Sequence, residues 1–250
     1  IRNKKVDVLN AIRRINKEEV NHFAVRGQYG EGWMKGEKVP GYKQEKGVEP
    51  GSSTETFAAV KFYIDNWRWQ DVPFYLRTGK RLPAMVSEIN IQFRSVPHQV
   101  FPSVQGANRQ PNRLLISIQP LEGILLRFEA KHPGRPLRLT PVDMGFYYRE
   151  AFKVPSPEAY ETLLLDVMLG NAALFMRRDQ TEIAWKVISP ILEAWEAEAP
   201  NDFPNYQAGT WGPRTAEELI TRDGRQWFIP SLQNYQEALA RCLGEAGKET

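Results

Sequence analysis

The chain has 250 residues, of which 42% are hydrophobic and 11% aromatic, so it is long and apolar enough to bury a sizeable core as one large domain. Its formal net charge is only +3 and its charged residues are interspersed, which argues against a nucleic-acid partner. A single cysteine, Cys242, excludes an internal disulfide framework and favours a reducing, cytoplasmic location, and no apolar run approaches the roughly 18 residues of a membrane span.

The first fifth of the chain is predicted to contain a helix, a short strand and a long loop. Residues 4–16 fit an amphipathic helix, because their apolar residues recur at helical spacing on one face. Residues 22–29 fit a short strand. Residues 30–53 are rich in Gly, Pro, Lys and Glu, which is typical of a long exposed loop, and loops of that length are often functional.

The most informative segment, residues 54–82, leads from an apolar, strand-like stretch into the basic turn Arg77-Thr78-Gly79-Lys80-Arg81. A glycine followed by a lysine at the end of a strand lets the backbone approach an anion while the ammonium group meets it directly. The turn therefore suggests a phosphate or carboxylate site at Lys80. On spacing alone, a turn lysine is more often simply solvated, so both interpretations stay open at this point.

A run of strands is predicted over the middle of the chain. Apolar and polar residues alternate in four segments, at 60–65, 89–92, 114–119 and 124–129. A period of two residues is that of a strand with one buried face, and no crossover helix of the kind that a parallel sheet needs fits between the segments. We therefore predict a large, mostly antiparallel β-sheet with one face more apolar than the other.

Two long helices and a short one are predicted after the strands. Ser156 can cap the first, with Pro157 at its first position, and Thr215 and Glu218 have capping-box spacing for the short one. The first carries an apolar stripe made by Tyr160, Leu163, Leu164, Val167, Met168 and Phe175. The second spans residues 179–197 and presents on one face Ile183, Val187, Ile188, Ile191 and Trp195. The whole pattern predicts an α+β fold in which the helices pack on one face of the sheet.

The basic turn also resembles the signature of the C-terminal domain of the glucose-6-phosphate dehydrogenase family. The flanking segments agree in order, from Arg26-Gly-Gln-Tyr29 to Trp211-Gly-Pro213. The resemblance covers roughly residues 1–230 and implies one domain there, for substrate binding and dimerisation. Residues 231–250 fall beyond the pattern and are expected to be a C-terminal tail of unknown role.

The resemblance implies three substrate-binding residues. In the family, the lysine that matches Lys80 contacts the phosphate of the sugar, and the glutamine that matches Gln119 reaches the same phosphate, although a glutamine at a strand end is usually just solvated. Arg77 is expected either to support this site or to pair with an acid of the sheet. Many members have a second basic residue five positions after the turn lysine; Met85 stands there, so Arg81 is the expected substitute.

The same resemblance implies that the catalytic half lies elsewhere. In the family, an N-terminal domain carries the nucleotide-binding turn and the catalytic histidine motif, and neither motif occurs in this chain. We expect the intact protein to oxidise glucose 6-phosphate with NADP, the first step of the oxidative pentose phosphate pathway. The chain itself is expected to be a bacterial-type C-terminal part with no catalytic residue, no cofactor and no activity alone.

A second, structural NADP molecule is bound in this domain by animal members, through arginines on the strands. Asn90 and Ser117 stand at the matching positions here and cannot pair with a phosphate as arginine does. We therefore expect no structural NADP site. Scattered Asp and Glu residues show no metal-ligand pattern, so no metal is expected either.

The family also suggests a partner, because its sheet forms a dimer interface and its dimers pair into tetramers. A large sheet with a face left uncovered by helices needs a partner to bury that face. We expect a homodimer or homotetramer, with no nucleic acid or membrane partner. The alternative is a non-catalytic assembly module or a sugar-phosphate-binding module without enzyme history.

Overall fold

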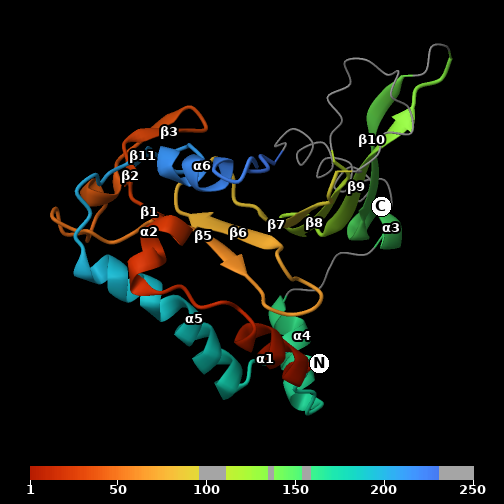
Figure 1. Ribbon diagram of the computed structural model, residues 1–250, viewed down its shortest axis with the longest axis horizontal. Helices are drawn as coiled ribbons and strands as arrows, with labels where there is room; N and C mark the ends of the chain where they lie inside the picture. Colours follow the sequence, from red (N-terminus) through yellow and green to blue (C-terminus); the bar gives the residue numbers. More distant parts are fainter. Residues whose placement is uncertain (96–110, 135–137, 154–158, 231–250) are drawn as a thin grey trace, which may run out of the picture. The chain divides into compact units, whose positions relative to one another are not determined.

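The computed structural model of the chain describes residues 1–95, 111–134, 138–153 and 159–230 (Figure 1). The predicted cap at Ser156 and Pro157 and the expected tail with Cys242 lie outside these residues. The chain divides into two compact units. Unit 1 is drawn from Ile1–Ala84 and Ala159–Trp227, and unit 2 from Met85–Glu158 and Phe228–Thr250.

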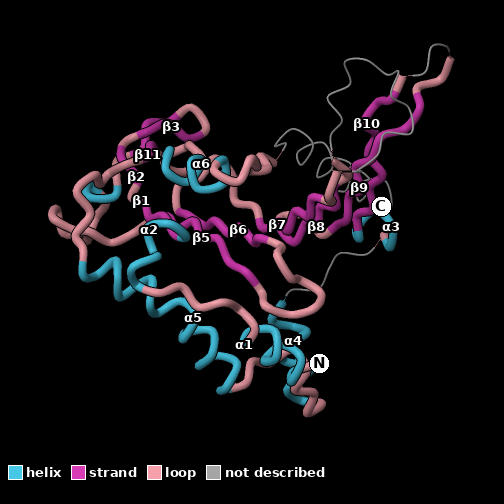
Figure 2. Tube along the Cα trace, viewed as in Figure 1, coloured by secondary structure: helices cyan, strands magenta, loops and turns pink. Residues whose placement is uncertain are grey.

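Both units combine helices with mostly antiparallel strands (Figure 2). The helices of unit 1 are α1 (Arg2–Asn10), η1 (Lys17–Glu19), α2 (Val20–Phe23), η2 (Tyr42–Gln44), α4 (Ala159–Met168), α5 (Arg178–Ala197) and α6 (Arg214–Thr221). Its strands are β1 (Ala24–Gly27), β2 (Tyr29–Gly30), β3 (Gly32–Met34), β4 (Glu37–Val39), β5 (Phe57–Tyr63), β6 (Pro73–Gly79) and β11 (Tyr206–Gln207). The elements of unit 2 are β7 (Ser87–Gln92), β8 (Arg113–Gln119), β9 (Gly123–Lys131), β10 (Leu139–Tyr147) and α3 (Tyr148–Phe152). This composition confirms the predicted α+β class.

The main sheet of unit 1 has the antiparallel order β1-β5-β6 and is covered on both faces. Phe57 and Ala59 of β5 pack in one core cluster with α6, whereas Val60 packs in another with Ile191 and Trp195 of α5. Successive residues of a strand point to opposite faces, so these two clusters lie on either side of the sheet, as do α5 and α6 in Figure 1. The prediction that the helices pack on one face only is wrong for this sheet.

The sheet of unit 2 has the antiparallel order β10-β9-β8-β7, so the described strands form two main sheets instead of one large sheet. Ile89, Ile116, Ile124 and Phe146 are register partners across all four strands and therefore share one face. Large apolar residues of this face remain exposed, among them Ile89, Ile124 and Phe146. The predicted difference between an apolar and a more polar face is confirmed for this sheet.

Several predicted boundaries were shifted by tertiary contacts. The first helix ends at Asn10 instead of residue 16, because the next residues extend along the sheet and Ile12 pairs with Ile64. The predicted strand at 22–29 begins only at Ala24, after the short helix α2. The predicted loop at 30–53 contains the hairpin of β3 and β4 and the short helix η2.

The long helices were predicted with mixed success. Helix α5 is confirmed, and Val187, Ile191 and Trp195 of its predicted face are buried. The stripe of α4 is not buried within the chain, since Tyr160 and Met168 are largely exposed. The capping box of the last helix was wrong: α6 begins after Pro213, and the Glu218 carboxylate accepts a hydrogen bond from Arg214 Nε at 3.0 Å. No helix of the described residues is both long and apolar enough to cross a membrane.

A buried ion pair ties the end of α6 to the sheet of unit 1. Lys61, in the middle of β5, is only 7% exposed, and its Nζ lies 2.6 Å from Oδ2 of Asp223 just after α6. The Tyr75 hydroxyl donates to the same carboxylate. Burial alone would raise the pKa of Asp223, but the hydrogen bonds from Lys61 and Tyr75 outweigh burial and hold that pKa below its usual value. The pair therefore stabilises the fold with Asp223 ionised.

Replacing Lys61 with methionine should destabilise the protein strongly, because the Asp223 carboxylate would be left without its cation. Removing one partner of a buried pair costs about 3 kcal/mol or more, measured as the free energy of unfolding in urea. Lys17→Met, which breaks an exposed pair with Glu193, is the matched control and should cost less than about 1 kcal/mol. The Lys61→Met deficit should shrink in acid, once Asp223 is protonated. Equal effects of the two variants would contradict the structural role of Lys61.

Candidate functional site

The predicted anion site lies where β6 ends and the chain turns away from the sheet. Gly79, the last residue of β6, is the register partner of Phe57 at the start of β5. A Cβ atom on Gly79 would lie 2.7 Å from Cδ2 of Phe57 and 3.3 Å from Cδ2 of Leu82. The turn can approach the buried Phe57 ring this closely because residue 79 has no side chain.

Hydrogen bonds from two other segments fix the backbone of the turn. Lys80 N donates to Thr56 O at 2.7 Å, and the Tyr206 hydroxyl donates to Lys80 O at 2.9 Å. Gly209 N donates to Arg81 O at 2.8 Å. Arg81 has a φ of 52°, a left-handed conformation that non-glycine residues adopt only where their surroundings hold them in it. The backbone around Lys80 is therefore a preformed platform.

The basic side chains of this turn differ in whether they already have a hydrogen-bond or ion-pair partner. Lys80 is exposed, and within the described residues its ammonium group has no hydrogen-bond or ion-pair partner. Arg81 donates to Glu45 Oε1 at 2.5 Å, and Tyr29 donates to the same oxygen at 3.1 Å. The hydrogen bond from Arg81, followed by that from Tyr29, lowers the pKa of Glu45. Arg81, the expected substitute for a second phosphate contact, is thus neutralised by Glu45.

Arg77 lies on β6, three residues before Lys80, and packs against aromatic rings. Its guanidinium carbon lies 5.0 Å from the centroid of the Trp211 ring and 4.7 Å from that of a Trp227 ring. Trp227 is fixed in turn, because its Nε1 donates to Ala216 O at 2.8 Å. A guanidinium group held over two rings gains cation–π attraction and stiffens the strand that leads into the turn.

Gln119 is the last residue of β8 and is exposed, opposite Ser87 at the start of β7. Lys80 and Arg77 both belong to unit 1, whereas Gln119 belongs to unit 2. Met85, which stands where many family members have a second basic residue, is also in unit 2 and is almost fully exposed.

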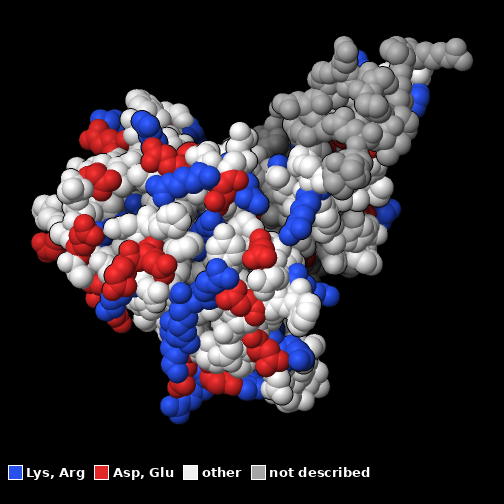
Figure 3. Space-filling model, viewed as in Figure 1, with Lys and Arg blue, Asp and Glu red and all other residues white. Residues whose placement is uncertain are grey.

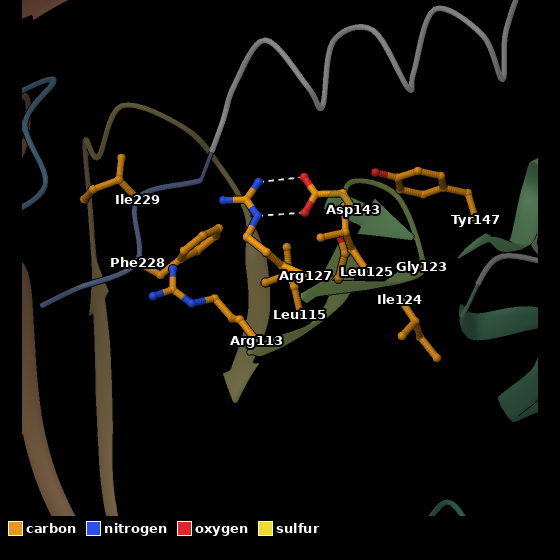
Figure 4. Close-up of a pocket in the computed structure, with 11 residues that line it drawn as sticks. Arg113, Leu115, Gly123, Ile124, Leu125, Arg127, Asp143, Tyr147, Phe228 and Ile229 are labelled. Atoms are coloured by element: carbon orange, nitrogen blue, oxygen red, sulfur yellow. Dashed lines mark hydrogen bonds and ion pairs between the residues drawn. The ribbon is translucent and has the colours of Figure 1, made fainter. Parts of the chain in front are cut away.

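Unit 2 contains a cavity of about 130 Å³ on the polar face of its sheet (Figure 4). Arg127 forms two hydrogen bonds across this face to Asp143, Nε to Oδ1 at 2.7 Å and Nη2 to Oδ2 at 2.6 Å. Arg113 lies over the Phe228 ring at 5.1 Å, and burial, followed by repulsion from Arg127, lowers its pKa. The Arg127–Asp143 pair was not predicted from the sequence, because β10, the strand that carries Asp143, was not predicted either.

The two residues that stand in place of the expected nucleotide-binding arginines also lie in unit 2. Asn90 is in β7 and Ser117 in β8. The Ser117 hydroxyl is buried and donates to Leu121 O at 2.6 Å, so it is engaged in holding the turn after β8. The expectation that no structural NADP binds here rests on these residue types and stays a prediction.

Charge on the described surface is mixed, as the sequence predicts. On the face shown in Figure 3, lysine and arginine side chains are intermingled with aspartate and glutamate. In the part of the chain that the structure describes, no three His, Cys, Asp or Glu side chains gather as a metal site requires. The face shown in Figure 3 is therefore mixed in charge and not uniformly basic.

Comparisons with known proteins all lead to one family. The family model described as "Glucose-6-phosphate dehydrogenase, C-terminal domain" matches residues 1–228. Glucose-6-phosphate 1-dehydrogenase of Mycolicibacterium smegmatis is 49% identical over 91% of the chain and 45% of that relative, and that of Treponema pallidum is 45% identical over 92% and 45%. A solved glucose-6-phosphate dehydrogenase in complex with its substrate glucose-6-phosphate superposes with a TM-score of 0.77 at 34% identity, over 91% of this chain and 45% of that one. The chain thus spans about half the length of the relatives it matches.

Replacing Gly79 with alanine should displace the turn, because the new methyl group would overlap the Phe57 ring. We expect a loss of about 1–3 kcal/mol in the free energy of unfolding, the usual cost of overpacking. Gly51→Ala is the control: a Cβ there meets no atom within 4 Å, so stability should stay the same or rise slightly. In the Gly79→Ala background, Phe57→Leu should cost less than it does alone. Simple additivity of the two changes would show that the ring is not what excludes a side chain at residue 79.

Proposed function

The chain belongs to the glucose-6-phosphate dehydrogenase family, as its C-terminal domain, and we propose that it holds the phosphate of glucose 6-phosphate for the intact enzyme. The observation that carries this proposal is the Lys80 ammonium group, exposed and without a partner in the described residues, on a backbone that three hydrogen bonds fix. A charge-assisted hydrogen bond from lysine to a phosphate oxygen is among the stronger polar contacts available to a protein. The solved relative that contains bound substrate supports the choice of sugar phosphate.

The proposed role is positioning, not chemistry. Oxidation of a sugar hydroxyl requires a base that takes the hydroxyl proton and an acceptor for the hydride. We propose that the base lies in the other half of the intact, cytoplasmic enzyme, that NADP bound there accepts the hydride, and that this chain alone does not complete the reaction. Binding energy at a phosphate remote from the reacting carbon can still raise the rate, because it orients that carbon toward the cofactor.

Two further residues have supporting roles in this proposal. Gln119, exposed at the end of β8, can donate its amide hydrogens to a phosphate oxygen as a neutral contact, the role that the family resemblance implies. Arg77, stacked on Trp211 and Trp227, stiffens the strand that presents Lys80. A protein without enzyme history, acting only in assembly or in sugar-phosphate binding, is the alternative to an enzyme. A test of the intact protein for NADPH formation separates the two.

We also propose that the sheet of unit 2 joins copies of the protein into a homodimer or homotetramer. Its apolar face exposes Ile89, Ile124, Val142, Met144 and Phe146. A contiguous exposed apolar face of this kind is typical of an interaction surface, and a self-complementary face generates a two-fold dimer. Stable homodimers bury on the order of 2,000 Å² or more in total.

The oligomer should therefore depend on Met144, an exposed residue of this apolar face near the middle of β10, the edge strand of the sheet. Met144→Asp should reduce the mass measured by light scattering at micromolar concentration, because a carboxylate would have to be desolvated in the interface. Trp67→Asp is the control, since Trp67 is fully exposed in unit 1 and should leave the mass unchanged. A wild-type mass equal to one chain would contradict the proposal outright.

In the intact enzyme, Lys80→Ala should mainly raise the KM for glucose 6-phosphate. Losing a charged hydrogen bond to phosphate costs roughly 1.5–3 kcal/mol, which lowers kcat/KM about ten- to a hundredfold. The KM for NADP should change little, because that cofactor binds elsewhere. Lys38→Ala, which removes an exposed lysine paired with Glu31, is the control and should leave both constants unchanged. If Lys80→Ala left the KM for glucose 6-phosphate unchanged, Lys80 would be an ordinary surface lysine that does not bind substrate.

A further inference from the structure

The Lys80 turn is fixed by a tyrosine that lies 126 residues further along the chain. The Tyr206 hydroxyl donates to Lys80 O at 2.9 Å and lies 3.0 Å from Thr56 Oγ1 and 3.2 Å from Thr56 O. Thr56 O also accepts the hydrogen bond from Lys80 N, at 2.7 Å. The backbone N–H and C=O groups of Lys80 are thus both hydrogen-bonded to the same small cluster, formed by the Tyr206 hydroxyl and Thr56.

Tyr206 itself is held rigidly by packing. Its side chain is only 6% exposed, and its ring lies 5.6 Å from that of Phe57 and 6.3 Å from that of Tyr29. Its backbone is also paired, because β11 runs parallel to β2 with Tyr206 opposite Tyr29. Burial raises the pKa of Tyr206, so the hydroxyl keeps its proton at neutral pH and remains a donor. Tyr206 is therefore held in one position, and its hydrogen bond to Lys80 O holds the turn in place.

We infer that Tyr206 is a positioning residue for substrate binding, which acts by fixing the backbone from which the Lys80 ammonium group reaches the phosphate; this inference rests on the proposed function. A lysine side chain has four flexible methylene groups, so the place of its ammonium group depends on where the backbone is held. Small misplacements of a binding group lower the rate even when the group itself is intact. Without the hydroxyl, Lys80 O loses the hydrogen bond that fixes its peptide plane.

The test is Tyr206→Phe in the intact enzyme, because phenylalanine keeps the ring and its packing and removes only the hydroxyl. We expect kcat/KM for glucose 6-phosphate to fall roughly three- to tenfold, which is the effect of losing one neutral hydrogen bond. The fall should come from a higher KM. The kcat and the KM for NADP should stay at their wild-type values. In a Lys80→Ala background, Tyr206→Phe should cause no further loss, because there is no longer an ammonium group to position.

Tyr75→Phe is the matched control, since it also removes one tyrosine hydroxyl, that of the half-buried Tyr75, which donates to Asp223. It should lower the melting temperature and leave the KM for glucose 6-phosphate unchanged. The positioning role would be overturned if Tyr206→Phe had a wild-type KM for glucose 6-phosphate. It would also be overturned if Tyr206→Phe lowered kcat/KM as much in the Lys80→Ala background as it does alone. In either case, a raised KM in Lys80→Ala would still support the proposed function. A wild-type KM in Lys80→Ala would overturn both.

Discussion

The ring of Phe57 is the point around which unit 1 organises its candidate site. It is 2% exposed, and Gly79 and Gly212 approach it so closely that a side chain at either position would overlap the ring. Gly212 also has a φ of 110°, a conformation that favours glycine. Tyr206 packs on the same ring. The close approach of these three segments brings the Tyr206 hydroxyl within reach of the Lys80 carbonyl, so the site depends on how tightly the core packs.

The strand pattern, α5 and the basic turn could be predicted from the sequence because each is a local signal. The burial of β5 on both faces could not, since Phe57, Ala59 and Val60 are all apolar and a continuous apolar run does not show which layers cover it. Strand β10 was missed because Pro141 and Gly145 interrupt its pattern. The contact between Tyr206 and Lys80 joins residues 126 positions apart, and no periodicity or spacing in one sequence encodes a contact of that kind.

Pairing decides which cations of the protein can bind an anion. Lys61 is satisfied by Asp223, Arg127 by Asp143 and Arg81 by Glu45, and each pair fixes one part of the fold. Lys80 is different, because its side chain has no partner in the described residues although its backbone is held at both ends. A fixed backbone under an unpaired cation means that little has to be reordered or displaced when a phosphate arrives.

In the proposed role, a domain of this kind contributes to catalysis without touching the bond that reacts. The interactions that hold Lys80 come from the Phe57 ring, Thr56 and Tyr206, none of which needs to meet the substrate. In the proposed role, their effect on the rate is indirect: the better the phosphate is placed, the smaller the entropy that must still be lost when the reacting carbon meets the cofactor. The proposed role therefore links the packing of this core, through one lysine, to the rate of a reaction carried out in another part of the protein.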